Sequence, residues 1–226
     1  MKKTIVILSL LLFFGIGLFA QPKAVGEPKA IAKSSELFTR PVWSLDGTKL
    51  FLNYGEWEVS VTGANLLKVS DAGSKLRATI CTEPLVVKMI SEPLEVASQV
   101  EGLKSLSGKI IINPVLSPQK DKIAFQAGNV LYICNTDGSG LRSIGTALLR
   151  ATWTADGKYL VAGIEGNDGH FITKGSLVSV DVATGAQTTL LSSNKYIAQS
   201  PAISPDGKKL AFEDYASGVI YIMDIQ

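Results

Sequence analysis

The chain has 226 residues, of which 22 are basic and 20 acidic, so its formal net charge is +2. Lys2 and Lys3 belong to an N-terminal leader, and without that leader basic and acidic residues balance at 20 each. A neutral chain argues against nucleic acid and anionic membrane surfaces as partners, because both select a basic face. The remaining length is enough for one domain with a sizeable core.

The N-terminus has the layout of a secretory signal peptide. Met1–Lys3 is basic, Thr4–Ala20 is almost wholly apolar, and Gln21 and Pro22 end the run. We expect cleavage after Ala20 and a periplasmic or secreted protein without stable membrane insertion. The alternative is a retained membrane anchor, since the run approaches the length that spans a bilayer. Residues 21–33 are predicted to be a loosely ordered lead-in, and residues 34–226 to be the folded domain.

A strand–turn–strand motif then recurs along the chain. It is found at residues 40–52, 113–125, 150–161 and 200–212, with a weaker echo at 76–82. In three copies a Ser or Thr stands two residues before Asp-Gly, a pair that favours tight turns. The copy at 113–125 keeps the strands and has lost the Asp-Gly pair. Five units start at 44, 82, 117, 154 and 204, which gives spacings of 38, 35, 37 and 50 residues.

A repeat of roughly 40 residues made of strands and turns is typical of a β-propeller, with one four-stranded blade per repeat. The sequence therefore predicts an all-β protein. In the first unit the strands are expected near Pro41–Ser44, Lys49–Tyr54, Trp57–Val61 and Asn65–Ser70. In the weaker second unit the later strands are expected at Leu85–Ile90, Leu94–Ala97 and Leu103–Leu106. Later units supply Val130–Cys134, Leu141–Ile144, Leu177–Val182 and Gln187–Leu191.

The last unit stops after its third strand, Val219–Ile225. Glu36–Thr39 precedes the first unit, where a fourth strand of the last blade would fit. Pairing the two would remove exposed sheet edges, which otherwise invite aggregation. We therefore predict five blades closed by strand exchange between the termini.

The repeat resembles that of the TolB-type propellers. The resemblance is carried by Pro201–Phe212 with Ile220–Asp224, and by Leu131–Gly140, and it is poor in the second unit. It covers essentially all of residues 36–226, and it departs from the family's pattern of six blades behind an N-terminal α/β domain. The resemblance implies an exported, non-catalytic protein that binds other proteins in the cell envelope.

Residues that could carry chemistry are sparse. His170 is the only histidine, so a metal site made of several histidines is excluded. A Ser-His-Asp triad would need this one residue as its base. Each Asp-Gly turn has a single carboxylate, which suits a turn better than a calcium site. Cys81 and Cys134 could form a disulfide, but both are expected on strands as small core residues. Trp43 and Trp153 are expected to pack between blades. We predict no metal and no cofactor.

Counting chain reversals places the expected partner surface. The Asp-Gly turns fall on one face, and the loops after each second strand fall on the other with the connections between blades. That second face receives aromatic and charged residues of the kind found in interfaces. These residues are Trp57, Asp168, His170, Phe171, Lys195, Tyr196 and Tyr215. Phe171 and Tyr196 are predicted to lead the contact. The alternative is that some of these side chains fold inward and plug the ring.

Unit four is 13 residues longer than unit three, and the excess lies at 165–175. Inserts in repeat proteins often form the binding face, and the alternative is a tolerated surface insertion without a role. The sequence thus predicts a monomeric, exported, non-catalytic module that binds a protein partner. The alternative is a carbohydrate-binding or glycan-processing propeller.

Overall fold

The structure is a computed structural model that describes residues 21–33, 37–69 and 83–226. The predicted signal peptide, Glu36, the echo at 76–82 and Cys81 lie outside the described residues. Within them the chain is mainly β, with four antiparallel four-stranded sheets. No helix in this part of the chain is long and apolar enough to cross a membrane.

The strands of each sheet follow the chain order, except in the sheet that contains both β1 and β16, the first and last described strands. The first sheet consists of β2 (Val42–Trp43), β3 (Lys49–Leu52), β4 (Trp57–Ser60) and β5 (Leu67–Lys68). The second consists of β6 (Ile111–Leu116), β7 (Lys122–Ala127), β8 (Val130–Asn135) and β9 (Arg142–Thr146). The third consists of β10 (Leu149–Trp153), β11 (Tyr159–Asn167), β12 (Ile172–Asp181) and β13 (Gln187–Ser192). The fourth consists of β14 (Ala198–Ile203), β15 (Lys209–Asp214), β16 (Ile220–Ile225) and β1 (Ala24–Ala32).

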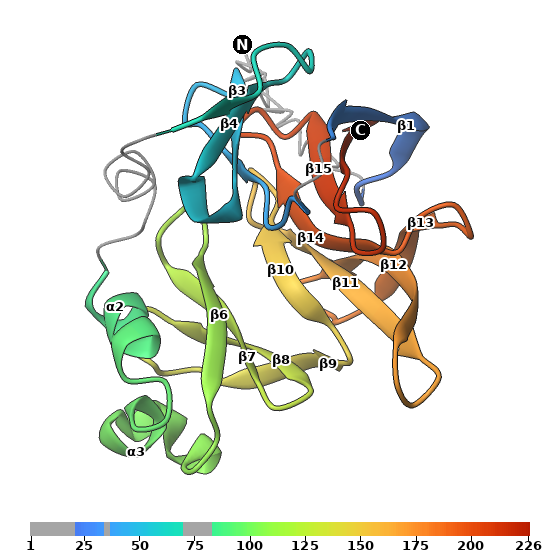
Figure 1. Cartoon of the computed structure of the whole chain (residues 1–226). Helices are drawn as coiled ribbons and strands as arrows, with labels where there is room; N and C mark the ends of the chain where they lie inside the picture. The colour runs from blue at the N-terminus through green and yellow to red at the C-terminus, as the bar shows by residue number, and fades with distance from the viewer. Residues whose placement is uncertain (1–20, 34–36, 70–82) are drawn as a thin grey trace, which may run out of the picture.

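The four sheets are the blades of a propeller. They lie around a central axis, with β6, β10 and β14 nearest the middle (Figure 1). Neighbouring inner strands touch, β14 with β2 and β10, and β10 with β6. Buried apolar side chains fill the spaces between adjacent blades, as in the cluster that joins Ile133 to Trp153 and Val180. The predicted propeller fold is confirmed.

The repeated hydroxyl residues hold the tight turns. Ser204 Oγ accepts a hydrogen bond from the backbone N–H of Lys209 at 2.9 Å and donates to Asp206 Oδ1 at 2.5 Å. Thr154 makes the same pair of bonds with Tyr159 and Asp156. Because each hydroxyl bonds to both ends of its turn, the repeated strand–turn–strand motif is also a unit of the structure.

The tryptophans join neighbouring blades, as predicted. Trp43 Nε1 donates to the carbonyl of Ala202 on β14 at 2.8 Å. Trp153 Nε1 donates to the carbonyl of Val115 on β6 at 3.1 Å. Both indoles are buried, and their single polar group is satisfied across the blade boundary. Cys134 lies buried on β8 as a free thiol, and burial raises its pKa to about 12.

The last blade is completed by strand exchange, but by a different segment from the one predicted. The strand is β1, whose Ala24, Lys29 and Ala32 pair with Ile225, Ile222 and Ile220. Residues 21–33 are therefore not a loose lead-in, and Leu37–Thr39 do not form a strand. The error has a physical cause. Most side chains of β1 are exposed, and two register shifts interrupt it, so it lacks the apolar alternation of a strand.

The second predicted unit is also corrected. Its expected strands at 85–90 and 103–106 are helical, in α2 (Pro84–Ser91) and η2 (Glu101–Leu106), and α3 (Val96–Gln99) lies between them. In α2 the buried residues are Leu85, Val86 and Met89, a spacing that fits one face of a helix, and Pro84 stands at its start. These helices pack on the face of the β6–β9 sheet that is turned away from the β10–β13 sheet (Figure 1). Five blades are thus not confirmed, and the described residues form four.

Candidate functional site

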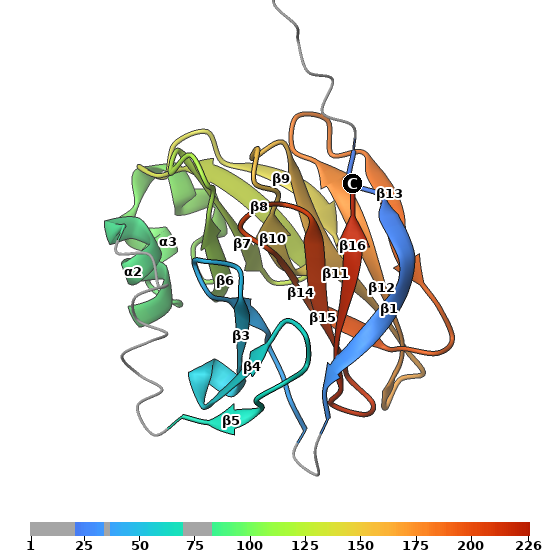
Figure 2. The same cartoon turned by 90° about the horizontal axis from the view of Figure 1, so that it is seen from above.

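The face opposite the Asp-Gly turns is here called the loop face, and four of its segments are described first. They are η1 (Asn53–Gly55), the turn at 168–171, the connection at 193–197 and the turn at 215–219. Hydrogen bonds tie some of these parts together, since Tyr215 N donates to the carbonyl of Ile197 at 2.9 Å. The turns that follow β11 and β15 project to the same edge of the molecule in Figure 2, on the side of η1.

The long unit four is an extended hairpin and not a loose loop. Strands β11 and β12 stay paired from Tyr159–Asp181 out to Asn167–Ile172, and only residues 168–171 form the tip. Asp168 Oδ1 fixes that tip by accepting the backbone N–H groups of His170 (2.9 Å) and Phe171 (2.8 Å). The same two bonds, that of Phe171 first, lower the pKa of Asp168. Asp168 therefore acts as a turn residue that presents its neighbours.

Phe171 is the most exposed aromatic side chain among the described residues, with 74% of its surface accessible. His170 beside it is exposed as well, and Tyr215 on the next blade is 51% exposed. Lys195 lies in the connection between these blades and pairs loosely with Glu27 at 3.7 Å. The structure thus places these four predicted residues on the solvent side of the loop face.

Two other predicted residues are largely turned inward. Tyr196 packs edge-on against Tyr221 and Phe212, with ring centroids 4.7 and 5.9 Å apart. Trp57 packs edge-on against the buried Phe38 at 5.6 Å, and its indole nitrogen is buried without a hydrogen-bond partner among the described residues. Both side chains belong mainly to the core of their blades. The exposed aromatic pair on this face is Phe171 and Tyr215.

At the middle of the ring the structure shows a feature that the sequence analysis missed. Three inner strands contain one non-glycine residue with positive φ, namely Asn113 (52°) in β6, Arg150 (49°) in β10 and Ser200 (48°) in β14, and Arg40 (51°) stands two residues before β2. All four occupy the equivalent place in their repeats, and a proline or alanine follows each of them. This equivalent position in the repeats was the sequence signal that could have identified these four residues. It went unused because single polar residues before proline suggest ordinary turns.

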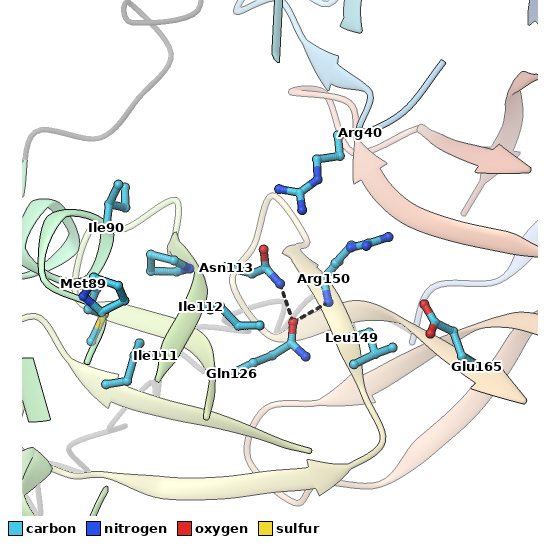
Figure 3. Close-up of a pocket in the computed structure, with 12 residues that line it drawn as sticks. Arg40, Met89, Ile90, Ile111, Ile112, Asn113, Gln126, Leu149, Arg150 and Glu165 are labelled. Atoms are coloured by element: carbon cyan, nitrogen blue, oxygen red, sulfur yellow. Dashed lines mark hydrogen bonds between the residues drawn. The ribbon is translucent and has the colours of Figure 1, made fainter. Parts of the chain in front are cut away.

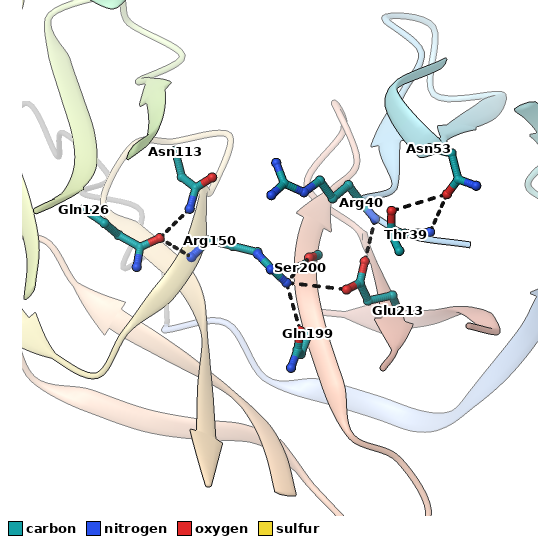
Figure 4. Close-up of polar contacts among 9 residues, drawn as sticks. All are labelled: Thr39, Arg40, Asn53, Asn113, Gln126, Arg150, Gln199, Ser200 and Glu213. Carbon is teal, nitrogen blue, oxygen red and sulfur yellow. Dashed lines mark hydrogen bonds and ion pairs between the residues drawn. The ribbon is translucent and has the colours of Figure 1, made fainter. Parts of the chain in front are cut away.

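Two of these residues are fixed by the blade that precedes them. Gln126 Oε1 on β7 accepts the backbone N–H of Arg150 at 3.0 Å and the Asn113 amide at 2.7 Å. Glu213 Oε2 on β15 accepts the backbone N–H of Arg40 at 2.5 Å. Figure 4 shows these contacts as a chain across the centre. Left-handed backbone at a bulky residue costs on the order of 1 kcal/mol or more, and these bonds offset that cost.

The arginines border a cavity of about 650 Å³. Figure 3 shows Arg40, which precedes β2, reaching toward Asn113 on β6 and Arg150 on β10. The polar lining is Arg40, Asn113, Gln126, Arg150 and Glu165, and the apolar lining is Met89, Ile90, Pro93, Ile111, Ile112, Pro114 and Leu149. A second cavity of about 360 Å³ shares Arg40, Asn113, Pro114 and Arg150 with the first.

The larger cavity lies on the side of the loop face. Ile111 and Leu149 are the first residues of β6 and β10, and Glu165 is near the end of β11. These strand ends are opposite the Asp-Gly turns. The cavity and the exposed aromatic residues therefore belong to one side of the propeller. Among the described residues no group of three His, Cys, Asp or Glu side chains lies close enough to hold a metal ion.

No family model matches the sequence, and neither does any curated protein. Solved structures that resemble the chain include a protein assigned as TolB from Agrobacterium tumefaciens, with 19% identity, a TM-score of 0.40, and coverage of 86% of this chain and 60% of that one. TolB from Acinetobacter baumannii shows 17% identity and a TM-score of 0.39 over 87% of this chain and 45% of that one. The Swd1 β-propeller domain of Myceliophthora thermophila shows 13% identity and a TM-score of 0.41 over 84% and 51%. The chain thus spans about 60% of the Agrobacterium structure, and its propeller fold follows from its own sheets.

Proposed function

We propose that the chain is an exported, non-catalytic propeller that binds a protein partner in the cell envelope through its loop face. The observation that carries the proposal is the presentation of Phe171. The paired strands β11 and β12 and the Asp168 hydrogen bonds hold a large apolar side chain in solvent, 74% exposed. A pre-ordered aromatic residue loses little conformational freedom on binding, which is why such residues serve as interface anchors.

Export is supported by the sequence of the predicted leader, and cleavage after Ala20 would leave the contacts of the first described residues in place. Lys23 N, three residues after Ala20, donates to the carbonyl of Gln226 at 2.9 Å. Gln21 Nε2 also donates to the carbonyl of Ser179 at 3.3 Å. A chain cleaved after Ala20 would keep both anchors. Sequencing of the N-terminus of the protein isolated from its cells is expected to read from Gln21.

Site-specific photo-crosslinking in living cells tests the proposed surface. A photoreactive phenylalanine analogue at position 171 is expected to give an adduct with one envelope protein. The matched control is the same analogue at position 45, since Leu45 is 75% exposed and lies in an Asp-Gly turn on the opposite face. Adducts from position 45 with none from position 171 would place the partner on the wrong face.

A further inference from the structure

The second strand of the β10–β13 sheet extends beyond the first strand. In the second and fourth sheets the first strand pairs with the second up to the last residue of that second strand. Strand β10, in contrast, begins opposite Gly163, whereas β11 continues to Asn167. Residues 164–167 are paired with β12 on one side. On the other side they have no neighbouring strand in the part of the chain that the structure describes.

Hydrogen bonds at both ends of the β11–β12 hairpin show which backbone groups face this open side. Val182 N donates to the carbonyl of Lys158 at 2.9 Å, and Asp168 N donates to the carbonyl of Phe171 at 3.2 Å. The register shift near the tip places its extra residue in β12, so the alternation along β11 is unbroken. Even-numbered residues of β11 therefore direct N–H and C=O toward β12, and odd-numbered residues direct theirs away from it.

Beyond the end of β10, the odd-numbered residues of β11 are Glu165 and Asn167. Their backbone N–H and C=O groups have no hydrogen-bond partner among the described residues. Glu165 is half-buried and Asn167 is exposed, so the edge is open to solvent. The opposite edge of the hairpin is covered sooner, because Gly175 on β12 bridges to Ile197. An uncovered row of alternating donors and acceptors is a template for another extended chain.

The open edge of β11 borders the larger cavity. Glu165 lines this cavity together with Leu149 and Ile112, and Figure 3 shows Glu165 and Leu149 at the same end of the lining residues. Side chains directly opposite each other in neighbouring strands lie on the same face of a sheet. A residue added beside Glu165 therefore directs its side chain to the cavity, where Leu149 and Ile112 offer apolar surface. The next residue of the added strand faces away.

We propose that the edge of β11 at residues 164–167 receives an extended segment of the protein partner as an additional strand, with an apolar side chain beside Glu165 in the cavity. The proposal rests on the proposed function for the source of the segment. In this mode of binding, backbone pairing supplies affinity, and pockets for alternate side chains supply selectivity. The edge ends at the turn that carries Phe171, so the added strand and Phe171 contact the partner on one continuous surface.

Amide hydrogen exchange, measured by NMR on the purified protein, tests the edge. Without ligand, the protection factors of Glu165 and Asn167 should be at least about tenfold lower than those of Ile164 and Gly166, whose N–H groups face β12. The probe is acetyl-Thr-Val-Thr-Val-Thr-amide. Its matched control carries methyl groups on the backbone nitrogens of the three central residues. At saturation the first peptide should slow exchange at Glu165 and Asn167 at least about fivefold, and the methylated peptide should not.

Two variants separate the backbone of the edge from its side chain. Glu165→Pro removes an N–H that points away from β12, a position where edge strands tolerate proline, and should abolish the slowing at Asn167. Glu165→Gln keeps that N–H and should bind the peptide within about twofold of the parent, because backbone groups make the contact. If Glu165→Pro lowers the melting temperature, the two peptides on the unaltered protein decide the test.

Equal slowing by both peptides, or slowing by neither, would overturn the proposal. Protection of Glu165 and Asn167 that rises with protein concentration alone would assign the edge to a second copy of the chain, and would overturn it as well. Peptide binding without partner capture at position 171 would count against the proposed function alone. Capture at position 171 without any effect of the peptide would count against the added strand alone.

Discussion

Asp46, Asp156 and Asp206 each accept a hydrogen bond from the hydroxyl two residues earlier, and the repeat could be found because this pattern is local in sequence. The copy without Asp-Gly restores the same bond by another route. Ser117 Oγ donates to Asp121 Oδ1 at 2.8 Å, and Lys120 takes the positive φ, 58°, that glycine supplies elsewhere. The Asp-Gly pattern does not detect this replacement, because the positive φ of Lys120 is a property of the backbone and not of the residue type.

The pKa of Asp46 is lowered from 3.8 to about 2, chiefly by the Ser44 hydroxyl and then by the Thr48 backbone N–H. A carboxylate with a lowered folded-state pKa stabilises the fold above its unfolded-state pKa, and this contribution is lost as the pH falls through the folded-state pKa. Asp46→Asn should therefore melt at a lower temperature than the parent at neutral pH. The difference should shrink from about pH 4 downward and vanish near pH 2. Thermal melts across this range check it, and a constant difference would contradict it.

Two glycines of the β11–β12 hairpin give opposite predictions. A Cβ on Gly163 would meet only the carbonyl oxygen of Leu149, at 3.6 Å, whereas a Cβ on Gly175 would lie 2.6 Å from Ala198 N. Gly163→Ala should be neutral or stabilise by up to about 1 kcal/mol, because it restricts the unfolded chain. Gly175→Ala should destabilise by about 1–3 kcal/mol, because backbone must move. Urea unfolding of the pair measures both, and equal effects would contradict the packing described.

At the scale of whole elements, buried strands with a regular apolar pattern could be predicted from the sequence, and the edge strand β1 could not. Strands such as β7 and β15 are buried and apolar beside a strong turn, so their sequences specify them. Helix α2 has its buried residues at helical spacing. The weak repeat at 76–82 nevertheless favoured a blade there, so strands were predicted in its place. Strand β1 is an edge strand whose side chains mostly face water, so pairing with β16 defines it more than its own pattern does.

Removing β1 tests the closure of the last blade. A protein that begins at Lys33 should melt about 10 °C or more below one that begins at Gln21, or should aggregate, because the edge of β16 becomes exposed. Calorimetry of the two proteins gives the comparison. Equal melting temperatures would show that the blade does not need its fourth strand.

At the scale of the molecule, the loop face combines exposed aromatic residues with a central polar cavity. The face itself could be predicted, because strand direction alternates along each blade. The cavity could not, because Arg40 and Arg150 line it together only once the blades are arranged around the centre. Burial of Tyr196 and Trp57 likewise depends on neighbours, Tyr221 and Phe38, that no local pattern connects to them.

The affinity of the protein captured at position 171 for the purified chain tests the central claim most directly. Phe171→Ala combined with Tyr215→Ala should weaken binding about 30-fold or more, the loss expected of interface anchors, and should leave the melting temperature unchanged since both side chains are exposed. Leu45→Ala, an exposed apolar truncation on the opposite face, should stay within twofold of the parent. A double variant that binds as tightly as the parent, with Leu45→Ala weakened, would contradict the account.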